Sequence, residues 1–181
     1  ADLVTAGYQV ADIGTDHAFV PVFLIESGKC HFAAAGDLRT GPLKNASSTI
    51  KVHNLNDRID AVLSDGFANM PDDCNVYIVA GMGGLLILNL INAAPFSFNR
   101  GCLLVLQPMS HEIELKKGLL KSGFEIFNQR VVSEGDRVYT AFSAEKVSDS
   151  PISFNEYSLY FPDFEHSSSC DIIKYKNKLM K

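Results

Sequence analysis

The sequence predicts an α/β protein with a doubly wound, mostly parallel sheet, and three observations lead to this fold class. The chain has 181 residues, 46% hydrophobic and 20% charged, which is the composition of a globular chain with a sizeable core. Short β-rich runs alternate with longer helical segments through residue 121. Two β-rich runs then follow each other directly, which predicts an antiparallel hairpin at the edge of the sheet.

The expected elements can be placed along the chain. Five short apolar runs are typical of parallel strands: residues 9–14, 32–36, 60–64, 76–80 and 102–106. Four segments between and after them are helical: residues 17–27, 42–54, 85–93 and 111–121. Pro21 and Pro42 are compatible with helices because each lies near a first turn, and Gly123 ends the last helix. Residues 124–132 and 138–145 are the two arms of the hairpin, with Gly135 in its turn.

The pattern changes after residue 146, so we expect a domain of residues 1–146 and an extension of residues 147–181. Residues 171–181 have the pattern of a short basic amphipathic helix. Residues 167–181 carry four lysines and one aspartate, a net charge of +3, in a chain whose net charge is −5. The extension therefore either packs on the domain or contacts a partner or RNA. Because the chain begins without methionine, eight residues before a strand, we expect it to be a fragment.

Composition excludes several classes of protein. No apolar run reaches the ~18–20 residues that a membrane-spanning helix needs, so we expect no membrane partner. The four cysteines form no CxxC pair, which argues against a zinc knuckle, a dithiol redox motif and a metal centre, and Cys74 and Cys102 should be buried. No signal-peptide pattern is present, which favours a cytoplasmic location. The sequence gives no signal for an oligomeric state.

Small or acidic residues follow four of the five predicted strands. In an open parallel sheet, ligands bind beyond these carboxyl ends, where the residues converge. The candidates after the successive strands are Asp12, Gly14, Asp16 and His17; Asp37 and Leu38; Asp65 and Gly66; Ala80, Gly81 and Met82; and Gln107.

The first of these loops is acidic and lacks the G-x-G-x-x-G spacing of dinucleotide sites. A pyrophosphate bound there would face Asp12 and Asp16, which disfavours a nicotinamide-dependent oxidoreductase. S-adenosylmethionine carries a sulfonium and an ammonium group, and both charges suit this loop better. The sequence therefore predicts S-adenosylmethionine as the cofactor.

Each of the remaining acids either binds the ligand or has a purely structural role. Asp37 is placed to accept hydrogen bonds from ribose hydroxyls, and Asp65 from an adenine amine, with Gly66 leaving room for the ring. Either acid, like Asp16, could instead cap a helix, which contributes about 1 kcal/mol. His17 either orients the methyl acceptor or is a polar residue at a helix start.

The glycines of residues 81–84 also have two interpretations. They either let the following helix pack closely on the sheet or clear space for a flat acceptor base.

Taken together, these motifs resemble the bacterial tRNA (adenine(22)-N1)-methyltransferase family. The residues that carry the resemblance are DIGTDHAFVP at 12–21, AGMGG at 80–84 and LQPM at 106–109, with Gly36-Asp37, Gly41-Pro42 and Ser64-Asp65-Gly66. The resemblance implies a Rossmann-like methyltransferase sheet, S-adenosylmethionine as donor and tRNA as acceptor. It also implies an N-terminal helix before this chain and a C-terminal coiled coil, for which residues 147–181 are too short.

We take Asp16, His17 and Gln107 as the candidate catalytic residues. An acid near the acceptor favours the cationic product base, and no strong base is needed because adenine N1 already has a lone pair. Phe19 and Met109 replace a tyrosine and an asparagine of the family. An alternative is therefore a donor-binding protein with another acceptor or no activity.

Binding to tRNA requires cations that contact phosphates. The candidates are the basic tail and eight further residues: Arg39, Lys44, Lys51, Arg58, Arg100, Lys116, Lys117 and Lys121.

Overall fold

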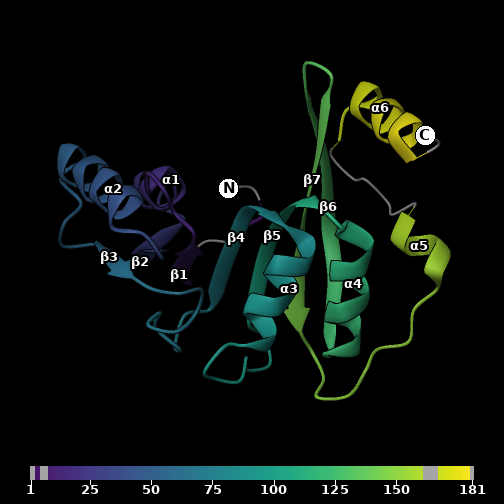
Figure 1. Cartoon of the computed structure of the whole chain (residues 1–181), viewed down its shortest axis with the longest axis horizontal. Coiled ribbons are helices and arrows are strands. Elements are labelled where there is room, and N and C mark those ends of the chain that lie inside the picture. Colours follow the sequence, from purple (N-terminus) through teal and green to yellow (C-terminus); the bar gives the residue numbers. More distant parts are fainter. Residues whose placement is uncertain (1–2, 5–7, 161–166, 180–181) are drawn as a thin grey trace.

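The sheet has seven strands in the order β3-β2-β1-β4-β5-β7-β6 (Figure 1). A computed structural model describes residues 3–4, 8–160 and 167–179 of the chain. The strands are β1 (Tyr8–Ile13), β2 (Cys30–Asp37), β3 (Ile59–Leu63), β4 (Val76–Gly83), β5 (Leu103–Ser110), β6 (Phe124–Glu134) and β7 (Arg137–Lys146). Strands β1 to β5 are parallel, and β7 joins the β6–β7 hairpin to β5 in antiparallel pairing. This topology confirms the predicted fold class.

Helices cover both faces of the sheet and divide the core in two. They are α1 (Phe19–Glu26), α2 (Thr40–Val52), α3 (Gly84–Asn92), α4 (Glu112–Lys121), α5 (Glu156–Tyr160) and α6 (Ser169–Leu179). Leu24 of α1 and Ile50 of α2 belong to one apolar cluster, and Ile87 of α3 and Leu115 of α4 belong to the other. Among the described residues, no helix has the length and apolar character needed to cross a membrane.

The strand order reverses beside β1. This strand pairs with β2 on one side and with β4 on the other, so the chain moves outward from it in both directions. In doubly wound sheets the loops that leave the carboxyl ends at such a point diverge and form a ligand crevice. The fold therefore places the loops after β1, β2 and β4 around one crevice.

Strands β4 and β5 continue past their predicted ends at Ala80 and Leu106. Gly81 and Pro108 normally interrupt a strand, which is why the sequence predicted shorter ones. The pairing of β4 with β5 does shift register on both sides of Met82, and Pro108 is paired opposite Met82 at that irregularity. The strands survive because the residue without an N–H sits where the regular ladder is already broken.

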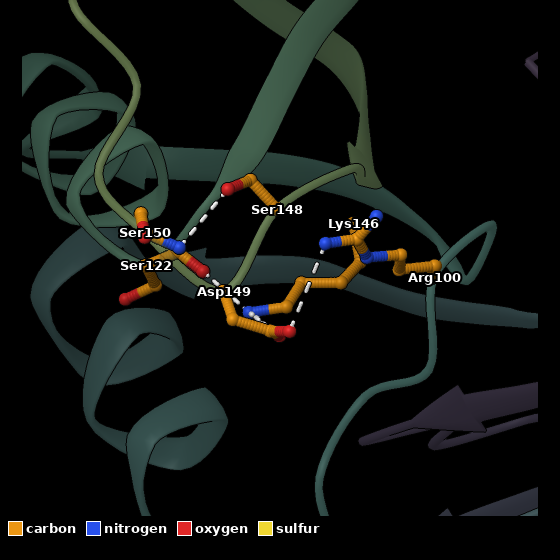
Figure 2. Close-up of polar contacts among 6 residues, drawn as sticks. All are labelled: Arg100, Ser122, Lys146, Ser148, Asp149 and Ser150. Atoms are coloured by element: carbon orange, nitrogen blue, oxygen red, sulfur yellow. Dashed lines mark hydrogen bonds and ion pairs between the residues drawn. The ribbon is translucent and has the colours of Figure 1, made fainter.

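Residues 146–149, where the extension begins, are bonded to the domain near the amino ends of the parallel strands. Figure 2 shows Lys146, whose Nζ donates to the Ser122 carbonyl at 2.7 Å and lies 3.8 Å from Oδ1 of Asp149. Arg100 Nη2 lies 3.9 Å from the other oxygen of that carboxylate. Lys146 is largely shielded while Asp149 is exposed, so most of the stabilisation here comes from the bond to the carbonyl.

Gly123 ends α4, as predicted, and the structure supplies a second reason for glycine. Its φ is 79°, and a Cβ at this position would collide with the carbonyl oxygen of Ser148. The backbone N–H groups of Val147 and Ser148 both donate to the Gly123 carbonyl, at 3.0 and 3.1 Å. The turn after α4 and the first residues of the extension are therefore one packed unit.

Helix α6 packs on the β6–β7 hairpin (Figure 1). Tyr175 of α6 is buried in an apolar cluster with Val131 of β6, and the N–H of Val131 donates to Ser167 Oγ at 2.9 Å. The helix predicted over 171–181 is confirmed through Leu179, and residues 180–181 lie outside the described residues. The division into residues 1–146 and 147–181 stays a prediction.

Candidate active site

A cavity of about 210 Å³ opens at the carboxyl ends of the first strands. Six of the ten residues predicted to bind the donor line it: Gly14, Asp37, Leu38, Asp65, Gly66 and Met82. The other lining residues are Ile13, Arg39, Ser64, Leu86 and Leu90. The structure thus brings the ends of β1, β2, β3 and β4 to one cavity.

Asp37 ends β2 inside the wall of this cavity. Its side chain is largely buried, and Oδ1 accepts the backbone N–H of Arg39 at 2.8 Å. The Arg39 Nε lies 4.0 Å from the same oxygen. Among the described residues no group donates to Oδ2, so one carboxylate oxygen is held in place while the other is available to a ligand. An available carboxylate oxygen is compatible with the predicted hydrogen bond to a ribose hydroxyl, and that role stays a prediction.

Gly14 allows the first loop to turn beneath the cavity. Its φ is +80°, and its N–H and that of Thr15 both donate to the Gly36 carbonyl, at 2.8 and 2.9 Å. A Cβ on Gly14 would collide with the Met82 methyl group. Glycine is therefore favoured here by the left-handed backbone, whereas the contact with the flexible end of Met82 could be relieved by a shift of that side chain.

The loop after β3 presents Asp65 at the cavity while its neighbours fix the backbone. Ser64 is buried, and its hydroxyl donates to the Gly66 carbonyl at 2.9 Å and accepts the Asn69 N–H at 3.0 Å. Gly66 has φ +56°, and a Cβ there would lie 2.6 Å from Leu90 Cδ2. The exposed Asp65 carboxylate is consequently held by a rigid turn beside an apolar wall.

Asp12 differs from the other acids because it is buried and does not line the cavity. Burial raises the pKa of its carboxyl from 3.8 to about 6, and the nearby Thr15 side chain partly offsets this. Asp12 was predicted to bind the donor directly, but it is absent from the residues that line the cavity. Asp12 precedes the Gly14 loop by two residues, and its role toward a ligand stays a prediction.

Asp16 and His17 lie on an exposed, strained turn after Gly14. Asp16 has φ 45°, and its Oδ2 lies 3.5 Å from His17 Nε2. The His17 ring stacks on the exposed Phe19 ring, with centroids 5.2 Å apart and planes 12° apart. The N-cap of α1 is Ala18, with no side-chain cap, so the capping alternative for Asp16 is wrong. Neither Asp16 nor His17 lines the 210 Å³ cavity.

Gln107 acts on the glycine-rich turn rather than on the cavity. Its Oε1 accepts the Gly81 N–H at 3.0 Å, and its Nε2 donates to the Pro108 carbonyl at 3.2 Å. Gly81 has φ +77° and open space around its missing Cβ. Ala80 and Gly81 are exposed and also lie outside the lining of the cavity. Gln107 is therefore a positioning residue that fixes the Gly81 turn.

The two interpretations of the glycine cluster apply to different residues. A Cβ on Gly84 would lie 2.5 Å from the His111 carbonyl oxygen and 2.6 Å from that of Ser110, so Gly84 serves close packing of α3. Gly81, by contrast, faces open space. Only the first part of the cluster leaves room for a ligand.

Sequence reasoning missed the apolar wall of the cavity and misassigned one cation. Leu86 and Leu90 lie four residues apart on α3, a spacing that places them on one helix face, and this signal was available. Lys116 was a candidate for phosphate contacts but is wholly buried, and its Nζ lies 2.5 Å from Glu112 Oε1. Burial lowers the pKa of Lys116 and the Glu112 carboxylate opposes that effect. It cannot reach a phosphate.

Comparisons with known proteins show which sequences and structures this chain is similar to. Residues 1–142 match the family model described as a methyltransferase domain. The tRNA (adenine(22)-N(1))-methyltransferase of Bacillus subtilis is 28% identical over 146 residues, 80% of this chain and 61% of the relative. A relative from Mycoplasma genitalium is 32% identical over 141 residues, 76% of this chain and 62% of the relative. The chain thus spans less than two thirds of either relative's length.

Solved structures show the same fold. A Streptococcus pneumoniae protein in complex with S-adenosyl-L-methionine has a TM-score of 0.87 and 26% identity, with 99% of this chain and 84% of that chain covered. A Streptococcus agalactiae protein of the NADB-Rossmann superfamily has a TM-score of 0.85 and 28% identity, with 99% and 79% covered. The Rossmann-like sheet and the resemblance predicted from the motifs are confirmed.

Proposed function

Because the chain belongs to the methyltransferase domain family, we propose that it binds S-adenosylmethionine at the cavity beside β1, β2 and β4 and methylates N1 of an adenine in tRNA. The named activity of the Bacillus subtilis relative supports the acceptor, and the ligand of the Streptococcus pneumoniae structure supports the donor. A tRNA substrate also supports the cytoplasm as the place of action.

One observation carries the proposal: two acids and a glycine turn share the wall of one cavity. Asp37 and Asp65 give the cavity negative charge, and Gly14 brings backbone close to a ligand. Asp37 would serve the ribose of NAD equally well, so it does not separate the two ligands. The first loop does, because a pyrophosphate there would face Asp12 and Asp16, whereas S-adenosylmethionine has no phosphate and carries positive charge. The residues present therefore fit this donor.

Each lining group has a role that its geometry allows. Asp37 would accept ribose hydroxyls through Oδ2 while the Arg39 N–H holds Oδ1 at 2.8 Å. Asp65 would accept the adenine amine of the donor, and the side chains of Leu86 and Leu90 would pack on its ring. Held in this way, the donor would present its sulfonium toward β4, where Met82 lines the cavity.

S-adenosylmethionine supplies an electrophilic methyl group when bound, and the protein's contribution is mainly alignment. Adenine N1 needs no deprotonation, but it faces its partner in a base pair and must be extruded first. His17, stacked on Phe19, offers a flat surface for the extruded base, and Asp16 favours the positive charge of the product. Gln107 supports the reaction by fixing the Gly81 turn.

A second candidate function is donor binding with another acceptor or without turnover. Phe19 favours it because its ring is 66% exposed and carries no hydroxyl to contact a base, and Met109 is likewise exposed and apolar. Incubating the full chain with tRNA and S-adenosylmethionine, followed by mass spectrometry of the nucleosides, separates the two. We expect 1-methyladenosine. Donor binding without any methylated nucleoside would refute tRNA methylation and leave the second candidate.

A further inference from the structure

Two adjoining cavities outside the proposed donor site form one groove. They measure about 720 and 440 Å³ and lie between the carboxyl end of β5, the β6–β7 hairpin and α6. Pro108, Met109 and Lys178 line both cavities. We call this the hairpin–α6 groove. Figure 1 shows α6 beside the hairpin.

The larger cavity has a cationic wall. Arg137, Lys174 and Lys178 line it against a single acid, Asp136. Lys174 Nζ donates to the Gly135 carbonyl at 3.0 Å, and Lys178 Nζ reaches a carbonyl of the hairpin at 3.3 Å. Among the described residues, no carboxylate lies within ion-pair distance of Arg137 or Lys178. Their charges are available to an anionic partner.

The acids of the smaller cavity are partly engaged already. Glu112 lies 2.5 Å from Lys116 Nζ and accepts the Thr140 hydroxyl at 2.6 Å. Glu114 lines the same cavity and is exposed. The cationic part of the groove is therefore the part formed by α6 and the hairpin tip.

The groove begins one strand away from the donor cavity. Met82 of β4 lines the donor cavity, and its register partner Pro108 of β5 lines the groove. Neighbouring strands lie about 4.8 Å apart, so a chain lying in the groove passes next to the methyl donor. Gln107, which fixes the Gly81 turn, directly precedes Pro108 and pairs with Ala80, two residues before Met82.

The walls of the groove are fixed to each other. The Ser133 N–H donates to Asp171 Oδ1 at 3.0 Å, and Tyr175 is buried against the hairpin. The hydrogen bonds from Ser133 and Ser168 lower the pKa of the Asp171 carboxyl, so this link is present at neutral pH. Lys174 and Lys178 are thus held at defined positions, because each also donates to a carbonyl of the hairpin.

We propose that the hairpin–α6 groove binds the RNA backbone next to the target adenine, with Arg137, Lys174 and Lys178 contacting phosphates. The inference rests on the proposed function, because that function supplies an anionic chain that must pass the donor cavity. It assigns the basic helix of the extension to substrate binding, and it adds Arg137, which sequence reasoning did not select.

The test removes two charges and keeps side-chain bulk: Arg137→Gln with Lys178→Gln in the full chain. The matched control is Lys176→Gln, an exposed lysine of α6 that does not line the groove. Affinity for unmodified tRNA is measured at several salt concentrations, together with donor affinity by calorimetry. We expect about tenfold weaker tRNA binding at 0.1 M salt. The slope of the logarithm of the binding constant against the logarithm of the salt concentration should be smaller in magnitude by about two. Donor affinity and the control should match wild type.

Each other outcome overturns a specific statement. Wild-type tRNA affinity in the double variant, or an equal loss in Lys176→Gln, overturns the groove assignment even when methylation is intact. A wild-type protein that binds tRNA through this groove but never methylates it overturns the proposed function alone. A wild-type protein with no measurable tRNA affinity overturns both.

Discussion

Replacing Asp12 with asparagine should stabilise the protein in a pH-dependent way. Burial raises the pKa of this carboxyl from 3.8 to about 6. Between these values the folded state holds a proton that the unfolded chain releases, so a rise in pH through this window favours unfolding. The cost is absent below pH ~4 and complete above pH ~7. A difference of about two pKa units corresponds to about 3 kcal/mol.

Asp12→Asn keeps the size and one oxygen of the side chain and removes this cost. The variant should exceed wild type by about 1.5 kcal/mol at pH 5 and about 3 kcal/mol at pH 7.5. Urea unfolding followed by circular dichroism measures both, since the chain has no tryptophan. Asp16→Asn, an exposed acid of the same loop, is the control and should change stability by less than about 0.5 kcal/mol. Equal stability at pH 7.5, or a gain independent of pH, would refute the reasoning.

Three further substitutions test the site and the scaffold. Asp37→Ala should abolish donor binding in calorimetry while Asp60→Ala, an exposed acid on β3, leaves it intact; unchanged affinity in the first contradicts the ribose assignment. His17→Ala should lower the single-turnover rate more than donor affinity, whereas His31→Ala should do neither; a wild-type rate in the first removes His17 from the mechanism. Gly123→Ala should destabilise the fold by about 2 kcal/mol or more in thermal unfolding, because alanine disfavours a positive φ and its Cβ meets a carbonyl. An unchanged melting temperature would contradict that account.

The sequence predicted the strands and the acids at their ends because hydrophobic periodicity and strand-end position are local signals. Asp37 and Asp65 follow directly from that logic, and both line the cavity. Asp12 does not line the cavity although its neighbour Ile13 does, because successive side chains of a strand point to opposite faces of the sheet. Whether a candidate acid lines the cavity therefore depends on the face of the sheet to which its side chain points, which strand position alone does not give.

Contacts between distant segments were beyond local reasoning. Gln107 accepts the N–H of Gly81, which is 26 residues away in the sequence. Lys116 pairs with the Glu112 carboxylate one helical turn away and is covered by α5, whose Leu159 carbonyl lies 3.4 Å from the Lys116 Nζ. The docking of α6 on the hairpin joins residues about forty apart, as in the bond from Lys174 to the Gly135 carbonyl. The Glu112–Lys116 pair has the i,i+4 spacing of a helical ion pair and was readable from the sequence, whereas the long-range pairings have no signature in composition or period.

The proposed function requires that S-adenosylmethionine occupy the cavity beside β1 that Asp37 and Asp65 line. Thermal unfolding in the presence of S-adenosylmethionine, its demethylated product or NAD tests that requirement directly. We expect the first two to raise the melting temperature by several degrees at concentrations near 100 times their dissociation constants, which adds about 2.7 kcal/mol, and NAD to have no effect. Stabilisation by NAD with no response to S-adenosylmethionine would contradict the account.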